Sequence, residues 1–236
     1  MRIASSLLLL AAVAGALTAS AGLGYRFGLW PLGQAFDMLR IGAWASAVAL
    51  GLGAFGLFYV LWRRRFVAGA LTLPGRALAG VSLYAPWRMA QLAQTLPAVN
   101  DIATDPDEPP AFVALAAARA QAPNGAAWRG NAAVQRAAYG DIEPLRLKLA
   151  PATAFARVEQ AARDLGWTVV AGDAAEGRLE ASARTRWFGF TDDVVVRLRP
   201  EGDLTRIDVR SASRLGTSDL GANAERIRAL LERLRL

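Results

Sequence analysis

The chain has 236 residues, 27 basic and 20 acidic side chains, 54% hydrophobic residues, and neither His nor Cys. Without Cys, the sequence has no disulfide framework, no thiolate zinc site and no iron–sulfur cluster. Without His, it has no Ser-His-Asp triad and no His-based metal site. We therefore predict no metal and no cofactor, and only carboxylates, hydroxyls, Lys and Arg are available for chemistry.

The net charge of +7 belongs to the first part of the chain. Residues 1–99 carry eight Arg and a single acid, Asp37, whereas residues 100–236 carry 19 basic and 19 acidic side chains. Arginines beside apolar segments set the orientation of a protein in a membrane. Nucleic-acid binding would need a basic domain, and the balanced charge of residues 100–236 excludes nucleic acid as a partner.

Two uncharged apolar segments near the N-terminus are long enough to cross a bilayer, residues 3–23 and 41–62. The second segment ends in aromatic residues and is followed by Arg63-Arg64-Arg65, which is typical of the cytoplasmic boundary of a transmembrane helix. The first segment contains Ala19-Ser20-Ala21, which fits signal peptidase, so a cleaved signal peptide over residues 1–21 is an alternative. The length of its apolar stretch favours a retained helix.

A third apolar segment, residues 66–87, decides the topology. It carries Pro74, Gly75 and Arg76 near its middle, and an Arg at mid-membrane costs about 2.5–3.5 kcal/mol on insertion scales. With the three preceding arginines in the cytoplasm, a spanning third helix places the rest of the chain outside the cytoplasm, and an interfacial one leaves it inside. Charge and hydropathy leave both arrangements open.

The remaining residues predict a loop-rich lead-in followed by a folded domain. Residues 91–140 contain an extended acidic break at 105–110 and a short Ala-rich helix around 112–121. From Asp141 onward, the hydrophobic periodicity predicts five strands and two helices. The strands are at 145–149, 167–171, 178–188, 193–199 and 206–215, and the helices are at 151–166 and 219–234.

The last three strands alternate apolar and polar residues, which predicts an antiparallel sheet with one buried and one solvated face. After the N-terminal transmembrane helices, residues 141–236 therefore have the order strand, helix, four strands, helix. This order predicts a compact domain of the α+β class, with a mainly antiparallel sheet covered by helices on one face.

Four sequence blocks carry a family resemblance. They are Asn100-Asp101-Ile102-Ala103-Thr104-Asp105 with Pro109-Pro110-Ala111-Phe112, Tyr139-Gly140-Asp141-Ile142, Trp187-Phe188-Gly189-Phe190-Thr191-Asp192-Asp193, and the long block 208–224. In these blocks the chain resembles the family catalogued as domain of unknown function 1499, over about residues 95–236. Members of that family look like bacterial envelope proteins, some with N-terminal transmembrane helices. The resemblance therefore implies an inner-membrane protein with three spans and an extracytoplasmic domain, and it implies no reaction.

The resemblance also contains one departure. Many relatives have His where this chain has Asn100. A reaction that depended on that His is not open to this chain.

The candidate binding site is the last strand, turn and helix. Arg210 and Arg214 share one strand face, Ser211 and Ser213 share the other, and a helix N-terminus, which binds anions, follows. The predicted ligand is a phosphate or carboxylate, such as a lipid headgroup or cell-wall fragment. The complete candidate set is Arg210, Ser211, Ser213, Arg214, Ser218, Asp219, Asn223 and Arg226. The structural alternative is that Ser218 caps the helix and Asp219 complements its dipole.

A second candidate is the acid pair Asp192 and Asp193. Paired carboxylates can bind a divalent cation or share a proton, which would suit a carboxylate-dependent hydrolase or transferase. The structural alternative is a salt-bridge lattice on a solvated sheet face, where each ion pair contributes about 0–1 kcal/mol. We assign no catalytic residue.

The sequence therefore favours a membrane-anchored envelope protein that binds a ligand or partner without being an enzyme. Its predicted partners are the lipid bilayer and either another protein or an anionic ligand. The alternatives are the carboxylate-dependent enzyme and an accessory subunit of a larger membrane complex.

Overall fold

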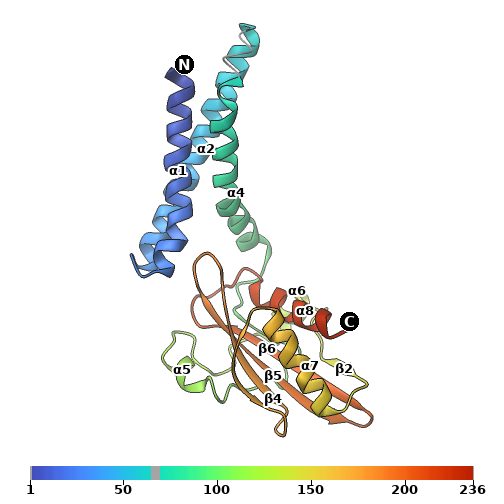
Figure 1. Cartoon of the computed structure of the whole chain (residues 1–236). Helices are drawn as coiled ribbons and strands as arrows, with labels where there is room; N and C mark the ends of the chain where they lie inside the picture. Colours follow the sequence, from blue (N-terminus) through green and yellow to red (C-terminus); the bar gives the residue numbers. More distant parts are fainter. Residues whose placement is uncertain (1, 65–69, 236) are drawn as a thin grey trace. The chain divides into compact units, whose positions relative to one another are not determined.

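The computed structural model describes residues 2–64 and 70–235. The chain divides into two compact units. The first comprises residues up to Gln91 together with Arg186–Gly189, and the second comprises Leu92–Thr185 and Phe190–Leu236. Figure 1 shows the helices and strands of both.

Long helices dominate the first unit. Its described residues contain α1 (Arg2–Arg26), α2 (Leu32–Trp62) and most of α4 (Leu73–Thr95). Two segments among the described residues are long and apolar enough to cross a membrane, Ser6–Arg26 and Leu32–Tyr59. They overlap the two apolar segments predicted from the sequence, 3–23 and 41–62, although the second begins earlier, at Leu32.

Small residues bring the three helices together. Ala11 of α1, Ala49 of α2 and Ala79 of α4 form a buried cluster. Gly75 of α4 lies so close to α1 that a Cβ at this position would be 3.2 Å from the Cα of Leu8. Close approach through Ala and Gly is the usual way in which helices pack inside membranes.

The third predicted segment, 66–87, is displaced along the chain. Residues 65–69 lie outside the described residues, and α4 runs from Leu73 to Thr95. Pro74 therefore lies in the first turn of α4, where its missing N–H costs nothing, and not at the middle of a helix. Within the described ranges, α4 is not among the helices that meet the length and hydropathy needed to cross a membrane. A third span thus stays a prediction.

An antiparallel sheet forms the second unit. Its strands are β1 (Asp101–Ala103), β2 (Leu145–Leu147), β3 (Thr168–Asp173), β4 (Arg178–Arg184), β5 (Thr191–Glu201) and β6 (Leu204–Ser213). Across the sheet the order is β1-β6-β5-β4-β3, and β2 also pairs with β6, beside residues 205–207, where β1 pairs with residues 210–212. The predicted α+β class is confirmed.

Two helices cover one face of this sheet, α7 (Pro151–Asp164) and α8 (Ala222–Arg235). The alternating residues of β5 and β6, including Val194, Val196 and Val209, pack with the apolar stripes of α7 and α8 in the main core. This face, which we call the helix face, agrees with the predicted alternation. Gly166, with a φ of +76°, ends the turn after α7.

The opposite face, which we call the outer face, is also buried, so the prediction that it is solvated is wrong. The segment between β1 and β2 crosses it and contains α5 (Ala116–Ala120) and α6 (Ala132–Ala138). Phe112 and Leu115 of this segment form a second apolar cluster with Val195 and Ala212 of the sheet. The residues expected to be a loop-rich lead-in therefore provide both a strand and the cover of the outer face.

Candidate functional site

The predicted strand–turn–helix site is divided between the two faces of the sheet. Arg210 and Arg214 lie on the outer face, where they bind Asp101 and Asp193. Ser211 and Ser213 lie on the helix face. The alternation read from the sequence is thus confirmed, but it separates the candidate arginines from the candidate serines.

On the helix face, the polar side chains form a closed network. Ser211 Oγ donates to Asn223 Oδ1 at 2.6 Å, and Asn223 Nδ2 donates to Ser213 Oγ at 3.0 Å. The Arg226 guanidinium donates to Ser211 Oγ and Asn223 Oδ1, and to Asp192 Oδ2 at 2.6 Å. Because buried polar groups are stable when they are hydrogen-bonded, this network fixes α8 on β5 and β6.

A carboxylate of the chain itself occupies the start of α8. The two oxygens of Asp219 accept the backbone N–H groups of Gly221 and Asn223, each at 2.8 Å. Burial is the largest influence on Asp219 and raises its pKa. Asp219 thus takes the position that an external anion would need at this helix N-terminus. An anion site at this turn stays a prediction.

On the outer face, the Arg210 guanidinium is buried with its partners. It donates two hydrogen bonds to Asp101 and stacks over the rings of Phe112 and Trp128, at 4.7 and 5.2 Å from their centroids. Three backbone carbonyls also accept from it, those of Pro110, Ala126 and Ala127. Arg210 therefore joins the segment 101–128 to the sheet.

Asp192 and Asp193 do not form a pair. Asp192 lies on the helix face with Arg226, whereas Asp193 lies on the outer face and binds Arg214, Arg119 and Ser182 at 2.7–2.9 Å. Burial disfavours the charged form of Asp193, but the bonds from these partners outweigh it and lower its pKa. Neighbouring residues of a strand point to opposite faces, so the two carboxylates cannot share a proton or a cation.

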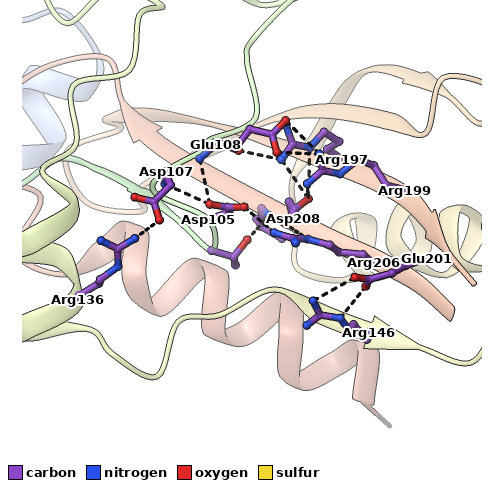
Figure 2. A network of polar contacts seen from close by, with 12 residues as sticks. Asp105, Asp107, Glu108, Arg136, Arg146, Arg197, Arg199, Glu201, Arg206 and Asp208 are labelled. Carbon is purple, nitrogen blue, oxygen red and sulfur yellow. Dashed lines mark hydrogen bonds and ion pairs between the residues drawn. The ribbon is translucent and has the colours of Figure 1, made fainter.

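A third network surrounds Asp208, farther along the outer face (Figure 2). Its carboxylate is 0% exposed and accepts from the guanidinium groups of Arg197, Arg199 and Arg206 at 2.9–3.3 Å. Arg206 also donates to Asp105 at 2.6 Å. Salt bridges were expected only around Asp192 and Asp193, and this network, centred on the fully buried Asp208, was not predicted from the sequence.

Figure 2 also shows two ion pairs at the margin of this network, Arg136 with Asp107 and Arg146 with Glu201. The side chains of the first pair are 55% and 71% exposed, and those of the second are both 45% exposed. Exposed pairs of this kind contribute about 0–1 kcal/mol. Arg136 and Arg146 are more exposed than the three arginines that bind Asp208.

A polar cavity of about 570 Å³ lies beside these pairs. Its lining comes from the residues after β1, from α6, from the approach to β2, and from β6. It includes Thr104, Asp105, Asp107, Gln135, Arg136, Tyr139, Glu143, Arg146 and Arg206. This site was not predicted from the sequence, although the block Tyr139-Gly140-Asp141-Ile142 borders it. Within residues 2–64 and 70–235, no three acidic side chains gather as a metal ion would require.

The family model described as "Protein of unknown function (DUF1499)" matches residues 101–234. The match begins at β1 and continues into α8, so it includes the segment that covers the outer face. The comparison with curated proteins found no match.

Proposed function

Because the chain belongs to the DUF1499 family, which is described only as proteins of unknown function, we propose a role from its own residues. The protein is anchored in the membrane of the bacterial envelope, and its α+β domain binds a ligand without catalysing a reaction. One observation carries the proposal. Two apolar helices of spanning length precede a domain in which arginines bind both candidate acids, Asp192 and Asp193.

The anchor is supported by the packing of the N-terminal unit. α1 and α2 contain the two segments of spanning length, and α4 packs on both through small residues. The eight arginines before residue 100, and the cluster at Arg63-Arg64-Arg65 after α2, are typical of a membrane protein with that cluster in the cytoplasm. We propose that residues 66–87 complete the anchor and place the domain outside the cytoplasm.

The connection between the anchor and the domain is short. α4 ends at Thr95 and β1 begins at Asp101. Residues 96–100 can extend by at most about 20 Å. This short tether supports a ligand that is found at the membrane surface.

Asp192 and Asp193 lie on opposite faces of the sheet. Their separation favours a binding function over a carboxylate-dependent reaction. Each carboxylate is bound by arginines on its own face of the sheet. An acid–base pair needs two carboxyl groups that act on the same substrate. The polar cavity, in contrast, has the volume of a small-molecule site.

Two measurements test the anchor and its orientation. Full-length protein should stay in the membrane fraction after carbonate washing, and release into the aqueous fraction would contradict an integral anchor. Fusions after Gly140 should give active alkaline phosphatase and non-fluorescent green fluorescent protein. The opposite pair of results would place the domain in the cytoplasm and remove the third span.

A further inference from the structure

We propose that the polar cavity binds a zwitterion with a phosphate group and a primary ammonium group, of the phosphoethanolamine type. The phosphate contacts Arg136 and Arg146, and the ammonium contacts Glu143. The proposal rests on the proposed binding function and names its site and ligand class.

Several polar groups of the cavity lining are already hydrogen-bonded within the protein. The side chain of Gln135 accepts from Ala103 N at 3.1 Å and donates to Ala103 O at 2.5 Å. The hydroxyl of Thr104 accepts from Val209 N at 2.9 Å. These two residues hold the wall of the cavity against β1 and β6, and they leave the charged side chains to recognise the ligand.

Arg206 is also paired within the protein, with two carboxylates. It binds Asp105 at 2.6 Å and Asp208 at 2.9 Å, and these hydrogen bonds and charges raise its pKa despite partial burial. Asp105 in turn accepts the backbone N–H groups of Asp107 and Glu108. Arg206 and Asp105 therefore form a fixed, neutral part of the wall.

Arg136 and Arg146 differ from Arg206, because their ion-pair partners, Asp107 and Glu201, are exposed carboxylates. A phosphate can replace such a partner at little loss, since it offers several oxygens to the guanidinium fork. When Asp107 and Glu201 turn into solvent, two cationic groups remain at the cavity for one anion.

Glu143 supplies the opposite charge. Its side chain lines the cavity and is exposed, and within the described part of the chain it makes no ion pair or hydrogen bond. A free carboxylate beside two arginines repels a simple anion and attracts an ammonium group. The combination therefore favours a ligand that carries both charges over phosphate or a carboxylate alone.

The test uses the full-length protein in detergent micelles and isothermal titration with O-phosphoethanolamine. We expect binding that is weakened about tenfold or more by Arg146→Ala and by Arg136→Ala, because each removes a charge-assisted contact. The matched control is Arg163→Ala, which removes an equally exposed arginine from an ion pair on α7 and should leave the affinity unchanged. Equal weakening by Arg163→Ala, or no weakening by either cavity variant, would overturn the site.

The ammonium contact has its own test. Glu143→Gln should weaken phosphoethanolamine binding but leave inorganic phosphate binding unchanged or stronger. Phosphocholine should bind the wild-type protein more weakly than phosphoethanolamine, because its quaternary ammonium has no N–H to donate. If Glu143→Gln has the same affinity for phosphoethanolamine as the wild type, the zwitterion assignment is wrong.

Vesicles then distinguish a free ligand from a lipid headgroup. The full-length protein is first inserted in phosphatidylcholine vesicles. If phosphatidylethanolamine added to the bilayer then competes with soluble phosphoethanolamine, and Arg146→Ala weakens this competition, the cavity is assigned to the lipid headgroup. Binding to soluble phosphoethanolamine alone would assign it to a free metabolite. Carbonate washing of the same variants separates the two proposals: a protein that stays in the membrane but binds neither probe refutes the cavity assignment and leaves the anchor intact.

Discussion

The Arg210 guanidinium on β6 donates two hydrogen bonds, of 2.9 and 2.8 Å, to the carboxylate of Asp101 on β1, although 109 positions separate the two residues. Their side chains are 2% and 3% exposed. The pair joins the beginning of the folded domain to its last strand. The segment that starts at Asp101 is therefore part of the folded domain.

Breaking this pair should destabilise the domain strongly. Asp101→Asn leaves the Arg210 charge buried without an anionic partner, and such changes cost about 3–5 kcal/mol. Glu159→Gln is the control, because it breaks an exposed ion pair with Arg163 on α7 and should cost about 0–1 kcal/mol. Urea unfolding of the full-length protein in detergent, followed by tryptophan fluorescence, measures both. Similar midpoints for the two variants would show that the buried pair is not structurally important.

Stability should fall in acid, and Asp193 should account for part of the loss. The pKa of Asp193 lies below its ordinary value of 3.8 in the folded state, because the bonds from Arg214, Ser182 and Arg119 outweigh the effect of burial. Its contribution is therefore complete above the unfolded pKa and is lost as the pH falls through the lower, folded value. The folded pKa of Asp141 is also lowered, by its bond with Arg228, so Asp141 acts in the same direction.

The measurement for this prediction is the unfolding midpoint between pH 2 and 7. Asp193→Asn should be less stable than the wild type at pH 7 and should lose less stability on acidification. Asp219 has the opposite sign, because burial raises its pKa and its contribution is lost as the pH rises through the folded value. An acid transition that is equally steep in Asp193→Asn would contradict the role of Asp193.

Glu180 should control the order of the segment that covers the outer face. Its carboxylate, which is 0% exposed, accepts the backbone N–H groups of Val113, Ala114 and Leu115 at 2.7–3.1 Å. Glu180→Gln removes the negative charge and offers a single acceptor oxygen, and the loss should be about 1.5–3 kcal/mol. Hydrogen exchange should become faster at these three amides and stay unchanged in α7. Unchanged protection of the three amides would show that the carboxylate does not hold this segment.

The sequence predicted the elements after Asp141 because their apolar residues recur with clear periods. The strands at 178–188, 193–199 and 206–215 and the helix after Pro151 correspond to β4, β5, β6 and α7. β1 was missed because it has three residues, Asp101–Ala103, and begins with an acid. An Asp is compatible with a buried strand only when a partner neutralises it, and here that partner is distant in sequence.

The same reason explains the wrong prediction for the outer face. Charged residues such as Asp193 and Asp208 favour solvent when they are considered alone. Their burial depends on arginines and on a covering segment, and Arg119 is 74 positions from Asp193. The cavity could not be predicted either, because Asp105, Arg136 and Arg206 meet there only after β1 and β2 have paired with β6.

Two glycines with the same backbone conformation offer a final, internally controlled prediction. Gly177 has a φ of +61° and Gly202 a φ of +63°, a region that L-residues rarely adopt. A Cβ on Gly177 would lie 2.3 Å from the carbonyl oxygen of Leu198, whereas a Cβ on Gly202 would meet nothing within 4 Å. Gly202→Ala should cost about 1 kcal/mol from backbone strain alone. Gly177→Ala should cost more, because β5 must also move and Gly177 O loses its 2.7 Å bond from Leu198 N. Urea unfolding of both variants measures the difference, and equal destabilisation would show that the turn before β4 relaxes without disturbing β5.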